Sequence, residues 1–276
     1  GVPQNFPGKP FIVTESVSGL MTRGYYRMPS DSMFVWPARW DKPFYDASFS
    51  CSSYDNCHVP WGNRHEGTMR HVKNNDFISG QYVWTGFDYI GEPTPYGWPA
   101  RSSYFGIIDL AGFPKDVYYM YQSEWRPDKA VLHLFPHWNW KEGEPVDIWA
   151  YYNNADEVEL YLNGKSLGVR QKTDSTYHVS WRVPFTPGTL KAVSRLGGKD
   201  VLAKENHTAG EPARLVLTPD RSVIQADGSD LSFVTVDVCD IDGNRVPDAS
   251  PLIRFSVEGP GEIAGTDNGD PNDPNS

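Results

Sequence analysis

Two residues in the N-terminal part of the chain, Glu15 and Trp84, have types and positions that suit chemistry on a sugar. Glu15 follows the apolar run 10–14, which has the length and β-branched content of a buried strand. Trp84 ends a second such run, 77–84. The carboxyl ends of parallel strands meet at one edge, where a carboxylate can act at an anomeric centre while an indole ring stacks on the sugar face. We therefore expect Glu15 and Trp84 to face one pocket.

The segments around these residues predict one strand–helix–strand unit. Residues 16–62 are rich in Gly, Pro, Ser and aromatic residues and are predicted to form a long loop after the first strand. Residues 63–73 predict a short helix with Asn63 as its N-cap and Glu66 in its first turn. This order predicts a βαβ unit with parallel strands buried on both faces.

Composition and charge exclude several classes of partner. The 276 residues include ten Trp and carry a net charge of −10, which repels polyphosphate, so no nucleic-acid partner is expected. No apolar run approaches the eighteen or so residues of a membrane span. Seven scattered His, without CxxC or HExxH spacing, predict no metal site, and no cofactor is expected.

Three ordered segments resemble glycoside hydrolase family 2, the family of β-galactosidases, β-glucuronidases and β-mannosidases. Residues 10–15 resemble its seventh barrel strand, residues 80–89 its eighth, and residues 105–115 with an aromatic helix ending at Trp125 its closing loop and last helix. The resemblance implies a multidomain chain of α/β and all-β parts, in which residues 1–125 form the last two βα units of a (β/α)8 barrel.

The same resemblance assigns roles to individual residues. It implies that Glu15 is the catalytic nucleophile and that Trp84 is an aromatic wall of the sugar subsite. Asp88 would either position sugar hydroxyls or support the end of the second strand. Trp98 and Arg101, in the loop beyond, complete the substrate-binding candidates.

The implied reaction needs a second carboxyl group. In a retaining glycosidase one carboxylate attacks the anomeric carbon and the other protonates the leaving oxygen, at a separation of about 5 Å. The family's acid/base lies in an Asn-Glu pair, and this chain contains no Asn-Glu. We therefore expect the reaction in a longer parent protein and negligible hydrolysis by this chain alone.

One departure from the family pattern bears on the sugar. Family β-glucuronidases bind the sugar carboxylate with an Asn-x-Lys motif, and this chain has Ser103-Tyr104-Phe105 there. A buried carboxylate needs a charged partner. A terminal, neutral, β-galactoside-like sugar is therefore favoured, unless Arg101 replaces the Lys, which leaves β-glucuronidase-type specificity as an alternative.

Beyond residue 125, period-two alternation predicts two immunoglobulin-like β-sandwich domains, residues 126–210 and 211–276. Asn163-Gly164 predicts a two-residue hairpin in the first. The second has predicted strands at 231–238 and 253–257 but no closing strand, so we expect it to be incomplete, with a frayed C-terminus. Asp240-x-Asp242-Gly243 fits a turn better than a calcium loop, because the later Glu of such a loop is absent.

Two rival interpretations remain open: a non-catalytic carbohydrate-binding module and a purely structural fragment. Two barrel units cannot cover their own apolar faces, so exposure of these faces, self-association or filling by the missing barrel half is expected. Cys51 and Cys57 flank a turn-like segment and could form a disulfide, which their spacing does not decide. We interpret the early first strand as a start inside a larger protein, and a periplasmic or secreted location is suspected.

Overall fold

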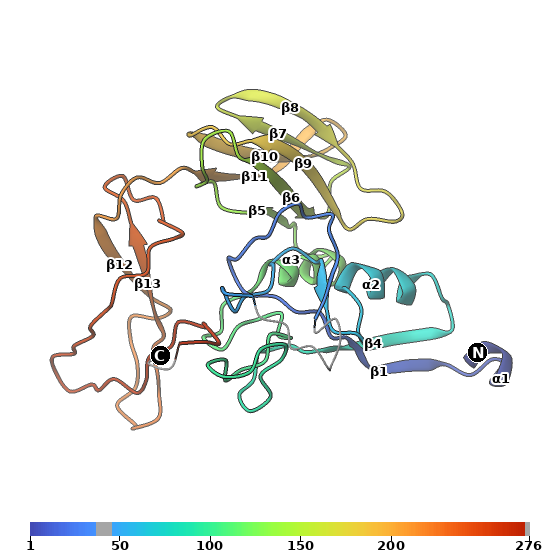
Figure 1. Ribbon diagram of the computed structural model, residues 1–276, viewed down its shortest axis with the longest axis horizontal. Coiled ribbons are helices and arrows are strands. Elements are labelled where there is room, and N and C mark those ends of the chain that lie inside the picture. Colours follow the sequence, from blue (N-terminus) through green and yellow to red (C-terminus); the bar gives the residue numbers. More distant parts are fainter. Residues whose placement is uncertain (37–45, 274–276) are drawn as a thin grey trace.

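The computed structural model describes residues 1–36 and 46–273, and most of them form four layers (Figure 1). The lowest layer in the figure is the strand pair β1 (Phe11–Val17) and β4 (Ile78–Trp84). Helices α2 (His65–Lys73) and α3 (Asp116–Trp125) lie above it. Two β-sheets lie above the helices, and a separate two-stranded sheet stands to the left.

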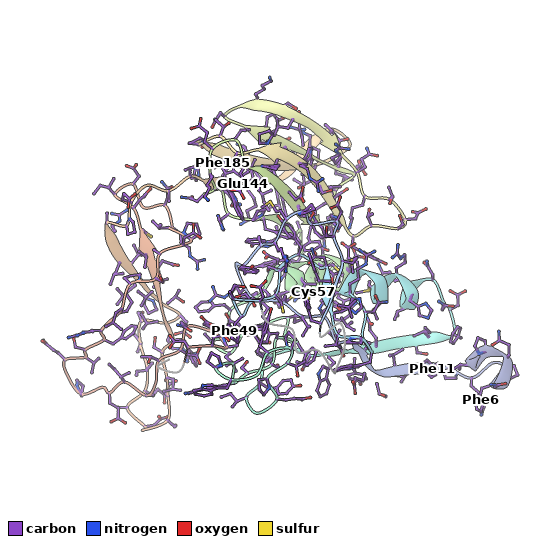
Figure 2. All side chains as sticks on the ribbon, in the orientation of Figure 1. Phe6, Phe11, Phe49, Cys57, Glu144 and Phe185 are labelled. Carbon is purple, nitrogen blue, oxygen red and sulfur yellow. The ribbon has the colours of Figure 1, made fainter. Side chains whose placement is uncertain are left out.

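Strands β1 and β4 pair in parallel, which confirms the predicted βαβ unit. The register places Val17 opposite Trp84, so the carboxyl ends of both strands lie at one edge. The strands are not buried on both faces within this chain, which agrees with the expectation that two barrel units alone leave an apolar face exposed. Val83 packs on the helical side, whereas Ile12 and Tyr82 are 53% and 68% exposed. Neither strand has a second strand partner within the described ranges, and Figure 2 shows the start of β1 at Phe11 lying well away from the crowded interior around Cys57.

Helix α2 is capped by a residue from the preceding loop. It begins at His65 with Arg64 as N-cap, so the predicted Asn63 N-cap is wrong. Instead, the Asp55 carboxylate accepts hydrogen bonds from the backbone N–H groups of His65 (2.8 Å) and Glu66 (2.7 Å). These N–H groups have no partner inside a helix, and a negative charge at this end also interacts favourably with the helix dipole.

Residues 126–210 form two antiparallel sheets that face each other. One contains β5 (Leu132–Phe135), β6 (Pro145–Tyr152) and β9 (His178–Pro184); the other contains β7 (Glu157–Leu162), β8 (Lys165–Arg170), β10 (Thr189–Leu196) and β11 (Lys199–His207). The hairpin β7–β8 turns through Asn163 and Gly164, both with positive φ (51° and 80°), as the Asn-Gly pair predicts.

Strand β6 is buried on both faces because it contributes to two cores. Ile148 and Ala150 point into the sandwich, where they meet side chains of the opposite sheet. Trp149 and Tyr151 point the other way and pack with Met69 of α2 and other side chains of the helical layer. The sandwich and the helical layer therefore share one strand.

Within the described residues the C-terminal unit contains a single hairpin, where an incomplete second sandwich was predicted. Strands β12 (Arg214–Pro219) and β13 (Val234–Cys239) pair with each other, and no strand is assigned among residues 240–273, so the predicted strand at 253–257 is wrong. The apolar side chains of this unit have no core to enter: Phe233 and Leu252 are 67% and 83% exposed. The predicted frayed end is also wrong for residues 268–272, which pack against loops of the α/β part.

The Asp240 segment forms a turn, as predicted. The Asp240 carboxylate accepts hydrogen bonds from the N–H groups of Gly210 and Asn244, and these bonds lower its pKa to about 2. Three short elements remain, namely α1 (Val2–Asn5), β2 (Phe34–Val35) and β3 (Cys57–His58).

The three cysteines form no disulfide. Cys51, Cys57 and Cys239 are free and buried, and burial raises the pKa of the Cys57 thiol. The disulfide that spacing left open is therefore not formed. In the described part of the chain no helix is long and apolar enough to cross a membrane.

Candidate active site

Glu15 lies at an irregular point of β1. The register between β1 and β4 shifts between Val13 and Ser16, which is the mark of a β-bulge. A bulge leaves a residue unpaired and re-aims its side chain. Glu15 is exposed, whereas Ser16 is buried, with its Oγ 2.9 Å from the Tyr82 carbonyl oxygen. The acid is thus presented on the surface while the next residue fastens β1 to β4.

The backbone that follows Glu15 is strained and held from outside. Val17 and Ser18 have φ values of 77° and 57°, in the left-handed region that costs about 1–3 kcal/mol for each non-glycine residue. The Asn63 N–H donates to the Val17 carbonyl oxygen (2.6 Å), and a Cβ on Gly62 would come within 2.5 Å of the same oxygen. The loop before α2 therefore fixes the turn, and it needs a glycine to approach so closely.

A pocket of about 220 Å³ opens beside Glu15. Roughly 300–1,000 Å³ is usual for a site that encloses a drug-sized ligand, so this pocket accommodates one end of a substrate rather than an oligosaccharide. It is lined by residues that follow Glu15, by residues of the loop before α2 and by one residue of α2 itself: Ser16, Val17, Ser18, Trp61, Gly62, Asn63 and Thr68. Trp61 was one of many loop aromatics in the sequence, and only the folded loop places it here.

Trp84 is not among the residues that line the pocket beside Glu15, so the structure does not place the two in one pocket as predicted. Trp84 contacts Tyr89 instead. Trp84 ends β4, is followed by a cis peptide bond, and packs edge-on against the Tyr89 ring with 5.8 Å between centroids. The Tyr89 hydroxyl donates to Glu92 Oε2 at 2.6 Å. Burial, this hydrogen bond and the negative charges of Glu92 and Glu15 raise the pKa of Tyr89 well above its ordinary value. Tyr89 was not predicted, because the run 84–99 contains several aromatic residues and acids that spacing does not rank.

Asp88 lies behind this surface, in a buried ion pair with Lys115. The two side chains are 3% and 1% exposed, and Lys115 Nζ is 2.7 Å from Asp88 Oδ2. Lys115 Nζ also donates to the Met21 carbonyl (2.8 Å), and the Gly106 N–H donates to Asp88 Oδ1 (2.7 Å). Burial raises the pKa of Asp88 to about 6, against the opposing effect of Lys115. A carboxylate this enclosed is out of reach of a sugar hydroxyl, so the geometry fits the second of the two expected roles, support of the strand end.

Trp98 and Arg101 form a second cluster. Trp98 is 71% exposed, and the Arg101 guanidinium lies over its ring at 5.1 Å from the centroid. The loop that carries them is closed by backbone hydrogen bonds from Gly91 N–H to the Arg101 carbonyl (3.1 Å) and from Ser103 N–H to the Tyr89 carbonyl (2.8 Å). The pair is therefore connected to the Glu15 region through the backbone beside Tyr89.

Within residues 1–36 and 46–273, no group of three or more His, Cys, Asp or Glu side chains is placed to hold a metal ion. The ends of β1 and β4 carry the Glu15 carboxylate and aromatic side chains. A carboxylate beside an indole ring can act at the anomeric centre of a sugar bound against that ring.

Comparison with known proteins shows which family this chain belongs to. Residues 215–276 match the model described as glycoside hydrolase family 2 C-terminal domain 5, and residues 143–202 match a domain of unknown function, DUF4982. The β-galactosidase BoGH2A of Bacteroides ovatus is 69% identical over 98% of this chain and 32% of its own length. A β-glucuronidase from Formosa agariphila, described as putative in its name, is 34% identical over 97% of this chain and 28% of its own length.

A solved structure agrees with these sequence matches. The crystal structure of a β-glycosidase from Bacteroides vulgatus is similar over 98% of this chain and 37% of its own length, with a TM-score of 0.87 and 32% identity. These similarities place the chain among the glycoside hydrolases. It belongs to glycoside hydrolase family 2, as a C-terminal portion, and spans about a third of the length of the curated relatives it matches.

Proposed function

We propose that this chain supplies the nucleophile strand of a retaining β-glycosidase, in which Glu15 attacks the anomeric carbon. The observation that carries the proposal is the β-bulge that exposes Glu15 at the end of β1, next to the end of β4 and Trp84. A covalent glycosyl intermediate requires an ionised carboxylate beside the sugar face, and Trp84 would form the wall on which that face stacks.

In this proposal β1 and β4 are the last two strands of a (β/α)8 barrel, and residues 126–210 are an immunoglobulin-like domain. The exposed face of β1 and β4 supports the barrel assignment, because Ile12 and Tyr82 would be covered by the other strands of the barrel. The acid/base that protonates the leaving oxygen would come from that missing part. The isolated chain is then expected to show negligible hydrolysis.

For the substrate we propose a terminal, neutral β-linked sugar, with β-galactosides first. The Ser103-Tyr104-Phe105 segment is buried and contributes no cation, and Lys115 is occupied by Asp88. The β-galactosidase name of the relative that is 69% identical supports the same choice.

The test uses the full-length parent protein and the substitution Glu15→Gln. Hydrolysis of a nitrophenyl β-galactoside should fall by about 10³-fold or more, because the covalent route is lost. Glu142→Gln, which changes an exposed acid in the loop before β6, is the matched control and should retain activity. A 2-deoxy-2-fluoro-β-galactoside should label the peptide that contains Glu15. Retained activity in the Gln variant, or labelling of another peptide, would overturn the assignment.

A second specificity is favoured by one observation. Arg101 lies on the segment that pairs with Tyr89 and Gly91, and the relative from Formosa agariphila is named for β-glucuronides. If Arg101 binds a sugar carboxylate, the parent should prefer the nitrophenyl β-glucuronide, and Arg101→Met should abolish that preference. Equal rates of the wild-type parent and Arg101→Met on the nitrophenyl β-glucuronide would exclude this role.

A further inference from the structure

Beyond the C-terminal hairpin, which ends at Cys239, the chain returns to the α/β part at residues 267–273 (Figure 1). Its fold is fixed locally by three side-chain to backbone hydrogen bonds. The N–H groups of Gly269, Asp270 and Asn272 donate to the side-chain oxygens of Asp267 (2.6 Å), Asn268 (2.8 Å) and Asp270 (2.9 Å). Such bonds stabilise turns in place of a helix or strand. The segment therefore has a defined shape before any contact with the rest of the chain is counted.

The returning segment makes backbone contacts with three separate parts of the α/β region. The Arg101 N–H donates to the carbonyl of the buried Pro271 (2.9 Å). Arg23 Nη2 donates to the Asn268 carbonyl (3.0 Å), and Asn272 Nδ2 donates to the carbonyl of Phe49 (3.0 Å). Figure 2 shows Phe49 on the side of the α/β part that faces the C-terminal ribbon.

Gly269 makes the closest approach of the segment. Its φ is +76°, and a Cβ at this position would lie 2.3 Å from Asp109 Oδ2. Asp109 is 1% exposed and accepts a hydrogen bond from Arg23 Nε at 2.5 Å. The Phe113 N–H donates to its other oxygen at 2.8 Å. A side chain on Gly269 would therefore collide with a carboxylate that is already held on both oxygens.

A short ladder connects the contact at Pro271 to the site. The Arg101 N–H donates to the Pro271 carbonyl, and the Arg101 carbonyl accepts from the Gly91 N–H. Two residues later, Ser103 exchanges hydrogen bonds with Tyr89: its N–H donates to the Tyr89 carbonyl (2.8 Å), and its Oγ accepts from the Tyr89 N–H (3.2 Å). The backbone that positions Tyr89 is thus held from the C-terminal segment.

We propose that residues 267–273 are an intramolecular clamp that fixes the loop 101–113 and thereby positions Arg101 and the Trp98 ring that it covers, as a second substrate-contacting surface apart from Trp84. That this surface contacts substrate rests on the proposed function, whereas the docking of the clamp does not. Trp98 is exposed and stacked on by Arg101, so it is the surface on which the part of a substrate beyond the reacting sugar can rest. A loosened clamp should therefore weaken binding of a disaccharide more than it slows the reaction of a small nitrophenyl glycoside.

The experiment compares Gly269→Ala with Gly259→Ala in the full-length parent protein. Both glycines have positive φ, but nothing lies within 4 Å of a Cβ at Gly259, so only the first variant adds a collision to the backbone strain. Peptides covering residues 101–113 should exchange backbone hydrogens about tenfold faster or more in Gly269→Ala than in Gly259→Ala. The KM for a β-galactosyl disaccharide should rise severalfold, while kcat for the nitrophenyl β-galactoside stays within about twofold.

The outcomes separate the two parts of the proposal. Equal exchange in the two Ala variants would overturn the clamp, whatever the activity. Faster exchange with an unchanged disaccharide KM would overturn its role in specificity and leave the docking in place. If Gly269→Ala does not fold, Asn272→Ala removes the bond to Phe49 without new backbone strain and should raise exchange of residues 101–113 to a smaller extent. Because hydrogen exchange is measured without turnover, this test of the clamp remains valid even if Glu15 is not the nucleophile.

Discussion

Replacing Lys115 by Met is the sharpest test of the structure behind the site. Lys115 Nζ contacts Asp88 at 2.7 Å and the Met21 carbonyl at 2.8 Å, and both charged side chains are almost fully buried. Met keeps the length of the side chain but leaves the Asp88 carboxylate with the Gly106 N–H as its remaining partner. Breaking one partner of a buried ion pair costs about 3–5 kcal/mol. At about 1.4 kcal/mol per factor of ten, local opening should become roughly 10²- to 10⁴-fold more frequent.

The cost of the substitution should increase with pH. Burial raises the pKa of Asp88 to about 6, above its ordinary 3.8, so the folded state binds this proton more tightly than the unfolded state. In the wild type, the contribution of Asp88 to stability therefore falls between about pH 4 and 6 and is constant above pH 6. Without Lys115 the pKa of Asp88 rises further, so its contribution to stability continues to fall as the pH rises above 6. The difference between variant and wild type should grow by about 1.4 kcal/mol per pH unit there.

Hydrogen exchange at the Gly106 amide is the appropriate measurement, because this N–H donates directly to Asp88 Oδ1. Wild type and Lys115→Met in the full-length protein are compared at the same pH, at several values between 5 and 8. Lys199→Met, on the exposed strand β11, is the matched control and should leave the exchange of Gly106 unchanged. If Lys115→Met exchanges like the control, or if its deficit is the same at pH 5 and pH 8, the reasoning about this ion pair is refuted.

Two further predictions concern the turn and helix next to Glu15. His65 is fully buried, and burial lowers its pKa from 6.5 to about 4, so the unfolded state binds the proton first and the free energy of unfolding should fall by about 3 kcal/mol between pH 6.5 and 4. Thermal unfolding of His65→Gln should show a correspondingly weaker loss of stability over this pH range, and an unchanged pH dependence would contradict the prediction. Gly62→Ala would bring a Cβ to 2.5 Å from the Val17 carbonyl oxygen and should lower kcat of the parent enzyme at least about tenfold. Gly97→Ala, where no atom lies within 4 Å of the new Cβ, is the control and should leave kcat unchanged. Equal rates for the two variants would show that the turn does not position Glu15.

The parallel pairing of β1 and β4 was predictable because it depends on local features. Two apolar runs separated by a helix leave few topologies, and a parallel pair brings the carboxyl ends together without any further information. The same reasoning could not find the bulge at Glu15. That bulge depends on Ser16 reaching Tyr82, a contact 66 residues away in the chain, and no pattern of hydrophobic residues encodes such a register shift.

The Asn63 cap and the strand at 253–257 were predicted from local sequence, but both are decided by parts of the chain that lie elsewhere. The Asn63 N-cap was predicted from the residue next to the helix, but the Asp55 carboxylate arrives from the preceding loop and satisfies the same N–H groups. The predicted strand at 253–257 alternates correctly, yet alternation gives a strand only where a second sheet covers the apolar side. In the described residues Leu252 and Val257 remain 83% and 54% exposed, so nothing there stabilises a strand.

The sandwich supports the position of Glu15 from behind the helices. Two His–carboxylate contacts cross the boundary between the helical layer and the sheet β5–β6–β9: His178 with Glu66 (2.5 Å) and His133 with Asp116 (2.7 Å). The His178 ring is stacked on Trp149 of β6 at 3.5 Å between centroids, which orients it toward α2.

Helix α2 then passes this support to the sheet that carries Glu15. Met69 of α2 and Val83 of β4 pack in the same core as Trp149, so a displacement of β6 would also displace β4. Val17, two residues after Glu15, is paired with Trp84 at the end of that strand. If Glu15 acts as proposed, a rigid scaffold under it matters, because a misplacement of about 1 Å can cost about 10²-fold in rate. The sandwich is therefore part of the support that holds Glu15, although none of its residues lines the pocket beside it.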